Sequence, residues 1–305
     1  MSGFIGTKLT MNLGERSYDI ILKNGALENL YQFARLDRRV AVVTDAGVPA
    51  EYAQRVADQC RDAKIITVPQ GEASKSMKIL ESVLRQMLEF NMGRGDLVIA
   101  VGGGVVGDIG GLAAALYMRG ISCVQVPTTL LAQADSGVGG KTAVDLGGVK
   151  NVVGAFYQPC EVIVDPMFLS TLPPREIKCG LGELVKYAAL DGGIFELLKA
   201  NADKLSEREF LFSLILPSVK HKAKVVEEDE KETGERKSLN VGHTTGHALE
   251  LASGLSHGES VLWGMLLETK LAMKYGVCAR EYGEELTALV HRALDVPPVG
   301  KIDFS

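Results

Sequence analysis

The sequence predicts an α/β first half followed by a helical second half. Up to about residue 173, short β-branched runs alternate with helical stretches, a pattern typical of a mostly parallel sheet with crossover helices. After TLPPRE at 171–176 the β-branched runs stop and helical patterns follow. The paired prolines at 173 and 174 mark the change, because proline ends one element and suits the first turn of the next helix. We therefore expect one domain at 1–172 and another at 173–305.

Four strands are expected in the first half, each followed by a loop rich in glycine, threonine or aspartate. They are RVAVVTD at 39–45, KIITVP at 64–69, DLVIAVG at 96–102 and SCVQVP at 122–127. The amphipathic stretch KILESVLRQMLEF predicts a helix between the second and third strands. Open parallel sheets bind ligands beyond the carboxyl ends of their strands, so these loops are the expected binding edge.

Composition and charge limit the function classes. With 46% hydrophobic and 23% charged residues, the 305-residue chain is globular. Its net charge of −5 lacks the basic surface that nucleic-acid binding needs. The five cysteines are scattered without a C-x-x-C pair, which favours a reducing compartment. No secretion signal is visible, and Asp108 interrupts the apolar stretch at 96–119. We expect a cytoplasmic protein with neither a nucleic-acid nor a membrane partner.

The first candidate motif is a glycine-rich loop between a strand and a helix. Gly102, Gly104 and Gly107 satisfy G-x-G-x-x-G, which lets backbone N–H groups approach a pyrophosphate. A Rossmann fingerprint also requires an acidic residue about 20 positions further on, where this chain has VPTT. The motif is thus compatible with nucleotide binding or with a close crossing of helix and strand.

Lysines on further glycine-rich connections point to an anionic ligand. QGEASKS carries Lys75, and LLAQADSGVGGKTAVDLGGVKN carries Lys141 and Lys150. A single loop lysine is most often solvated, but several on one sheet edge favour phosphate binding.

The second half contains a histidine cluster with metal-ligand spacing. His243 and His247 are four residues apart and share a helix face with Glu250, and His257 follows in SHGE. Spacing alone leaves open which of the histidines bind a metal. Glu183 and Lys186 lie one helical turn apart and by themselves predict an ordinary ion pair.

An acidic run, VVEEDEKETGER at 225–236, favours a solvated helix end and loop. Lys222 and Arg236 flank it and would also fit a binding cleft.

Seven motifs, in order from about residue 39 to residue 265, resemble the 3-dehydroquinate synthase family of sugar-phosphate cyclases. They are GGGVVGD, YMRG, VPTTLLAQADSGVGGK, KNVVGAFYQP, GELVKYA, LNVGHTTGHALE and HGE. The resemblance implies an α/β NAD-binding domain, an all-α metal-binding domain, and zinc or cobalt in the cleft between them. It also implies a homodimer.

The resemblance also implies roles for individual residues. The metal ligands are Glu183, His243 and His257. The catalytic residues are His247, Lys141, Glu232 and Asp135. The NAD contacts are Asp45, Glu72, Lys75, Gly103, Gly104, Asp108, Thr128, Thr129, Lys141, Lys150 and Thr171. The substrate contacts are Arg119, reaching across the dimer interface, and Asn151, Lys186, Lys222, Arg236 and Asn240.

The implied reaction converts 3-deoxy-D-arabino-heptulosonate 7-phosphate to 3-dehydroquinate and phosphate, in the shikimate pathway of aromatic amino acid biosynthesis. Transient oxidation by NAD is followed by phosphate elimination, reduction and aldol cyclisation, so NAD is not consumed. Two alternatives are another cyclase, similar to 2-deoxy-scyllo-inosose synthase, and a metal-dependent glycerol or glycerol phosphate dehydrogenase. A catalytically silent binding protein is a third.

Two departures from the family pattern stand out. Gly137 replaces a serine that is usual in the family, and GKIDFS at 300–305 lacks the family's glycine-flanked, substrate-contacting lysine. From the second departure we expect the natural gene product to extend beyond Ser305.

Overall fold

The computed structural model describes residues 6–294. The departure from the family pattern at 300–305 lies outside the described residues. By its internal contacts the chain forms two compact units, one up to Thr171 and one from Leu172. Whether these units are the functional domains stays a prediction. The expected fold class, α/β followed by all-α, is confirmed.

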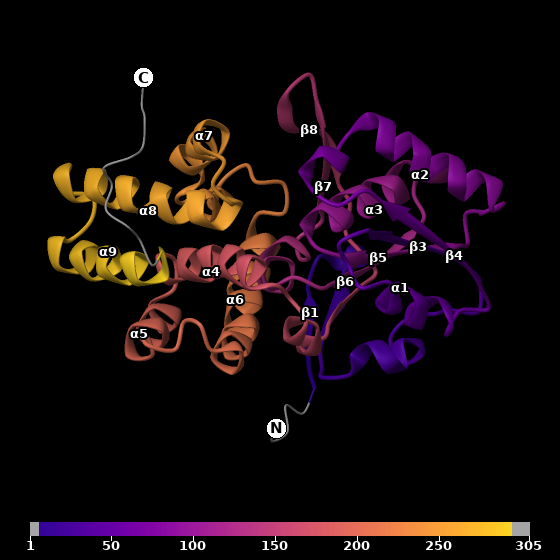
Figure 1. The fold of residues 1–305 in the computed structure, drawn as a ribbon, viewed down its shortest axis with the longest axis horizontal. Coiled ribbons are helices and arrows are strands. Elements are labelled where there is room, and N and C mark those ends of the chain that lie inside the picture. Colours follow the sequence, from indigo (N-terminus) through magenta and orange to yellow (C-terminus); the bar gives the residue numbers. More distant parts are fainter. Residues whose placement is uncertain (1–5, 295–305) are drawn as a thin grey trace. The chain divides into compact units, whose positions relative to one another are not determined.

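The first unit contains a seven-stranded sheet with helices on both faces (Figure 1). Within residues 6–294, only the first two strands of this sheet pair in antiparallel fashion. In spatial order the strands are β1 (Thr7–Met11), β2 (Tyr18–Leu22), β9 (Glu161–Val164), β6 (Ser122–Pro127), β5 (Leu97–Gly102), β3 (Arg39–Asp45) and β4 (Asp62–Val68). The four strands expected from the sequence are confirmed as β3, β4, β5 and β6. A separate hairpin, β7 (Lys141–Leu146) with β8 (Val149–Phe156), was not expected.

The central strands are buried on both faces, which explains their unbroken β-branched runs. In β3, Ala41 and Val43 pack into a core with α2 (Met77–Glu89) and α3 (Gly104–Leu116). Val40 and Val42 face the opposite core, with α1 (Ala50–Ala57) and the 3₁₀ segment η2 (Ala26–Gln32). This alternation is the two-residue period of a strand.

The second unit is helical throughout its described part. Its α-helices are α4 (Pro174–Ala188), α5 (Gly192–Ala200), α6 (Arg208–Glu228), α7 (His243–Ser253), α8 (His257–Lys274) and α9 (Arg280–Leu294). Pro174 is the first residue of α4, as the paired prolines predicted. The 3₁₀ segment η7 (Glu235–Asn240) precedes α7.

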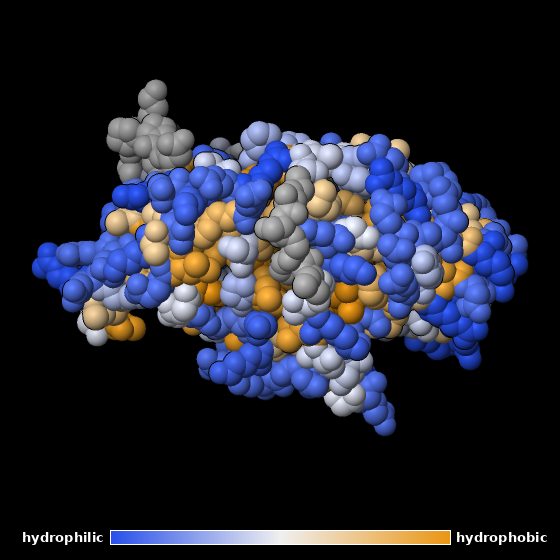
Figure 2. All heavy atoms as spheres, turned by 90° about the horizontal axis from the view of Figure 1, so that it is seen from below, coloured by the Kyte–Doolittle hydropathy of each residue, from blue (hydrophilic) through white to orange (hydrophobic). Residues whose placement is uncertain are grey.

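Hydrophilic residues cover most of the face in Figure 2, with apolar side chains interspersed among them. None of the helices within 6–294 is both long and apolar enough to span a membrane.

Glu161, at the start of β9, gives the fold a testable pH dependence. Its half-buried carboxylate has one oxygen without a hydrogen-bond partner among the described residues. Burial, reinforced by the charge of Asp19, raises the pKa of Glu161 to about 7. Between the ordinary pKa of a glutamate and about pH 7, Glu161 therefore keeps its proton in the folded state and has released it in the unfolded state. The stability of the protein falls as the pH rises through this range.

We expect Glu161→Gln to raise the melting temperature by about 1–2 °C at pH 8 and to leave it unchanged at pH 4.5. The amide removes the charge that costs stability only at the higher pH. Thermal unfolding at the two pH values measures the effect. An equal shift at both would contradict the assigned pKa.

Candidate functional site

The strand register brings the expected nucleotide-binding loops to one edge of the sheet. Asp45 pairs with the last residue of β4, and Gly102 pairs with Pro127 at the end of β6. These residues end parallel strands, so the loops that begin at Ala46, Gly103 and Thr128 leave the sheet on the same side. This is the edge at which open parallel sheets bind ligands.

The start of α3 has the features of an anion site. Its N-cap, Gly103, offers no side-chain cap to the first N–H groups of the helix. A Cβ atom at Gly103 would lie 3.0 Å from Thr129, and one at Gly104 would lie 3.0 Å from Ser136 Oγ. That hydroxyl is buried and lacks a hydrogen-bond partner within the described residues. Uncapped N–H groups, an unpaired hydroxyl and bare glycines fit a pyrophosphate.

The second interpretation of the glycine loop also holds. A Cβ atom at Gly102 would lie 2.6 Å from Val106, and one at Gly110 would lie 2.9 Å from the Cβ of Ala100. The glycines of this segment therefore also permit the close crossing of strand and helix.

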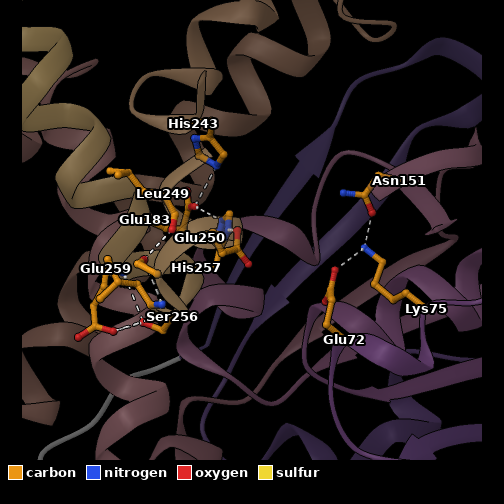
Figure 3. Close-up of polar contacts among 12 residues, drawn as sticks. Glu72, Lys75, Asn151, Glu183, His243, Leu249, Glu250, Ser256, His257 and Glu259 are labelled. Atoms are coloured by element: carbon orange, nitrogen blue, oxygen red, sulfur yellow. Dashed lines mark hydrogen bonds and ion pairs between the residues drawn. The ribbon is translucent and has the colours of Figure 1, made fainter. Parts of the chain in front are cut away.

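Lys75 joins three segments of the first unit. Its ammonium lies 2.6 Å from Asp108 Oδ2 on α3 and 3.7 Å from Glu72 Oε1, and it donates to Asn151 Oδ1 on β8 (Figure 3). The side chain is 6% exposed. Burial lowers the pKa of Lys75, but the charges of Asp108 and Glu72 outweigh that effect and raise it. Lys75 therefore stays charged and holds these loops together.

Asp145 belongs to this network, although the sequence did not indicate it. Its Oδ1 accepts from the backbone N–H of Asn151 at 2.8 Å, and its own N–H donates to the carbonyl oxygen of Lys75 at 2.9 Å. Nothing in the neighbouring sequence distinguishes an aspartate that accepts a backbone hydrogen bond from any other acidic residue near a Gly-Gly turn. The signal was the turn itself, whose flanking β-branched residues form the hairpin.

The other expected residues of the first unit occupy separate positions. Thr171 Oγ1 lies 2.6 Å from the hydroxyl of Tyr52, and Thr129 Oγ1 accepts from the N–H of Ala132 at 3.1 Å. Lys141 and Lys150 lie at opposite ends of the hairpin. Asp135 lies in the π-helical turn 132–136, and Arg119 ends the 3₁₀ turn 117–119.

The structure gives a reason for glycine at position 137. A Cβ atom there would lie 2.7 Å from the carbonyl oxygen of Ala132, so serine would require this turn to shift.

Three expected site residues have a left-handed backbone conformation. The φ angles are 70° at Arg119, 55° at Asn151 and 58° at Glu232. Such angles are costly for residues other than glycine, and they concentrate at functional sites. These three positions are therefore held by their surroundings rather than by local preference.

In the second unit, Glu183, His243 and His257 converge from three helices (Figure 3). Glu183 Oε1 lies 3.3 Å from His243 Nε2 and 3.1 Å from His257 Nε2. One ligand atom from each residue lies within 4.8 Å of the others. One carboxylate and two imidazoles are a donor set suited to zinc or cobalt, and three ligands leave a coordination position open. The residues present therefore fit a catalytic metal.

The negative charge of Glu183 is balanced by Lys186 and by the imidazoles of His243 and His257. Glu183 is 1% exposed and pairs with Lys186. Burial raises the pKa of Glu183, but Lys186 and the two imidazoles outweigh it and hold the pKa well below its usual range. Burial lowers the pKa of His257, but Glu183 and Glu250 raise it to about 10. The ion pair expected between Glu183 and Lys186 thus exists, but it is buried.

His247 lies beside this group. Its ring centroid is 5.4 Å from that of His243 and 5.9 Å from that of His257. His247, Glu250 and His257 form a second possible ligand group. The first group fits better because its carboxylate is buried and receives both imidazoles, which leaves His247 available for another role.

Glycines let the backbones of these helices touch. A Cβ atom at Gly182 would overlap the carbonyl oxygen of Gly258, and one at Gly258 would overlap that of Cys179. A Cβ atom at Gly264 would overlap the carbonyl oxygen of Gly242. Gly182, Gly242 and Gly258 are each next in sequence to an expected ligand.

Three of the expected substrate cations are buried. The acidic run that Lys222 and Arg236 flank is a helix end and loop whose polar residues are mostly exposed, as the sequence favoured. Lys186, Lys222 and Arg236 are 1%, 7% and 0% exposed. Nearby, the Nδ2 of Asn240 donates to Glu232 Oε1 at 2.8 Å.

Asp229 organises the connection between α6 and η7, although the sequence did not indicate such a role. Its carboxylate accepts from the N–H groups of Thr233, Gly234 and Arg236. Desolvation raises the pKa of Asp229, but these N–H groups lower it to about 2.

Two family models match the chain and together cover most of it. The model described as 3-dehydroquinate synthase N-terminal matches residues 65–179, and 3-dehydroquinate synthase C-terminal matches 180–301. The 3-dehydroquinate synthase of Pelobacter propionicus is 43% identical over 93% of this chain and 83% of its own length. That of Caulobacter vibrioides is 44% identical over 93% and 80%.

Solved structures of sugar-phosphate cyclases are also similar. A 2-deoxy-scyllo-inosose synthase with carbaglucose-6-phosphate, NAD+ and Co2+ is 28% identical, with a TM-score of 0.86 over 95% of this chain and 84% of that one. The 2-epi-5-epi-valiolone synthase of Streptomyces hygroscopicus, with NAD+ and Zn2+, is 30% identical, with a TM-score of 0.84 over 94% and 82%. A probable glycerol dehydrogenase of Sinorhizobium meliloti shares only the fold, at 18% identity and a TM-score of 0.63 over 91% and 81%.

The helix contacts predict that Gly258→Ala lowers the free energy of unfolding by about 2–3 kcal/mol, because the added methyl group overlaps the Cys179 carbonyl oxygen. Gly192→Ala, at the first position of α5, has no atom within 4 Å of its new Cβ. It should leave stability unchanged or raise it by about 0.5 kcal/mol. Urea unfolding monitored by helical circular dichroism compares them. Equal effects would show that α4 and α8 are not in this contact.

Proposed function

Because this chain belongs to the 3-dehydroquinate synthase family, we propose that the residues described above hold NAD, a divalent metal and the substrate of that reaction. The activity is that of a carbon–oxygen lyase, converting 3-deoxy-D-arabino-heptulosonate 7-phosphate to 3-dehydroquinate and phosphate. The resemblance stated from the motifs is thereby confirmed. Among the features of the structure, the convergence of Glu183, His243 and His257 carries the proposal.

Glu183, His243 and His257 are proposed as the metal ligands. When bound, zinc or cobalt acts as a Lewis acid that eases loss of a proton from a substrate hydroxyl group. Lys186 keeps the Glu183 carboxylate ionised, and Glu250, 3.4 Å from His257 Nδ1, orients that imidazole. His247 faces both histidine ligands and is proposed to contact the substrate and move its protons.

Buried cations are proposed to bind the substrate's two anionic groups. Lys186, Lys222 and Arg236 offer charge in a region from which water is largely excluded, where charge-assisted hydrogen bonds are strong. Glu232, which accepts from Asn240, is proposed as a proton partner. The further proposed substrate contacts are Asn240, Asn151 and, from a second subunit, Arg119. Lys141 and Asp135 are proposed as catalytic residues.

The edge of the sheet is proposed to bind NAD, which accepts a hydride from the substrate and returns it. Gly103 and Gly104 open the helix to the pyrophosphate, while Lys75 fixes the loop of Glu72 against Asp108. Asp45, at the end of β3, replaces the ribose-binding acid that is absent after the glycine loop. The other proposed NAD contacts are Thr128, Thr129, Lys141, Lys150 and Thr171.

The alternative activities are less well supported. The solved cyclases with other products share 28–30% identity with this chain, whereas the two 3-dehydroquinate synthases share 43–44%. The resemblance to glycerol dehydrogenase extends only to the fold.

We also propose a homodimer and a cytoplasmic location. The dimer is implied by the family resemblance, in which Arg119 reaches the substrate across the interface. All five cysteines are free thiols, as expected in a reducing compartment.

The proposed reaction predicts many turnovers of phosphate release from 3-deoxy-D-arabino-heptulosonate 7-phosphate with catalytic amounts of NAD and no net NADH. The hydride that the substrate loses is returned within each turnover. A phosphate assay and absorbance at the NADH band are read together. Release only from glucose 6-phosphate or sedoheptulose 7-phosphate would place the chain in another cyclase branch, and NADH accumulation with glycerol would indicate a dehydrogenase.

The ligand assignment predicts that His243→Ala and His257→Ala each lose stoichiometric zinc and turnover, whereas His247→Ala keeps zinc and loses turnover. The first two changes remove donors, and the third removes a proposed proton carrier. Metal analysis of the purified, folded proteins decides between them. Zinc loss in His247→Ala with retention in His257→Ala would overturn the assignment.

A further inference from the structure

The helix that carries His243 and His247 begins without a side-chain cap of its own. Its N-cap is Gly242, with φ 78°. A Cβ atom at this position would lie 2.6 Å from the carbonyl oxygen of Val261 and 2.7 Å from Met265 Cγ, both on α8. The residues that normally cap helices, such as serine or aspartate, therefore do not fit here. The first N–H groups of α7 need an acceptor from another element.

Glu268, on α8, supplies that acceptor. Its Oε2 accepts from the N–H of Gly242 at 2.7 Å, and its Oε1 accepts from the N–H of Thr245 at 3.2 Å. In a capping box, two side chains of the same helix make the equivalent two bonds. Here one carboxylate from a neighbouring helix makes both, and its negative charge also interacts favourably with the N-terminal end of the α7 dipole.

The position of Glu268 follows from the contact between the two helices. Gly264, one turn earlier on α8, lies against the carbonyl oxygen of Gly242. Residues four apart share a helix face, so the contact at Gly264 directs Glu268 toward the same end of α7. The glycine that prevents an ordinary cap and the glycine that brings the substitute into reach therefore belong to one contact.

We propose that Glu268 is a positioning residue for the metal site, acting through His243. This inference rests on the metal site proposed above. His243 is the first residue of α7 and lies between the two N–H groups that Glu268 binds. From that first turn its imidazole reaches Glu183 Oε1, at 3.3 Å from Nε2. When the turn frays, the binding-competent fraction falls, and the apparent metal affinity falls by the same factor.

The test compares Glu268→Ala and Glu268→Gln with Asp191→Ala in the full 305-residue chain. Asp191 makes a matched pair of bonds at the start of α5, accepting from the N–H groups of Gly193 at 2.9 Å and Ile194 at 3.0 Å. Helix α5 carries none of the proposed ligands. The zinc dissociation constant is measured by competition with a chelating dye, and the melting temperature of the metal-free protein is measured separately.

We expect Glu268→Ala to raise the zinc dissociation constant about tenfold, in the range of other residues that orient metal ligands. Glu268→Gln, which keeps one acceptor oxygen, should give a smaller rise. Asp191→Ala should lower the melting temperature by about as much as Glu268→Ala does, because each change removes a helix cap. It should leave the zinc dissociation constant within about twofold of wild type.

Three results would overturn the inference. Unchanged zinc affinity in a folded Glu268→Ala protein would leave Glu268 a purely stabilising role, and an equal loss in Asp191→Ala would show a general effect of stability. If Glu268→Ala does not fold, the Gln variant decides: weakened zinc binding supports the inference, and unchanged binding overturns it. A wild-type chain that binds no zinc would refute the proposed metal site itself, which separates that failure from this one.

Discussion

Direct contact between the backbones of α4, α7 and α8 is the constraint on which the helical unit depends. The three carbonyl contacts at Gly182, Gly258 and Gly264 leave no room for a methyl group. Because an expected ligand adjoins the contact on each helix, the separation of the helices sets the separation of the ligand atoms. A carboxylate buried as deeply as Glu183 is tolerated only when its charge is matched. Lys186 supplies one cation from the same helix, and the packing brings two imidazoles from α7 and α8.

The first unit reaches its organisation by a different route. Its expected ligand-binding residues lie on loops, which are held less firmly than packed helices. Lys75 compensates by linking its own loop to α3 and to the β7–β8 hairpin through Asp108 and Asn151, and Asp145 completes the link through the backbone. Ion pairs and hydrogen bonds thus hold these loops in place, whereas close backbone contacts at glycines hold the helices.

The sequence predicted the elements whose residues share a strong period or a continuous apolar run. The strands β3, β5 and β6 were predictable because burial on both faces requires such runs, and β4, at the edge of the sheet, was predictable from its β-branched residues. By contrast, β9 is four residues long and β8 has one exposed face. The histidine cluster indicated a metal, but Glu183 came only from the family resemblance, because its spacing from Lys186 is that of any surface ion pair. Asp145, Asp229 and Glu268 bind backbone N–H groups, which leave no mark on the sequence of their partners.

The glycines around the metal site also affect what a sequence motif means. Segments such as GELVKYA and GHTTGHA are easily taken as signatures of chemistry, yet Gly182, Gly242 and Gly246 are there because helix backbones touch. Selection for folding alone would preserve them. A descendant that had lost its catalytic histidines would still need these glycines and would still score well against the motif. Competence for catalysis in a divergent relative is therefore reported by the positions that bind metal and substrate, and the glycines of the motif report only the architecture.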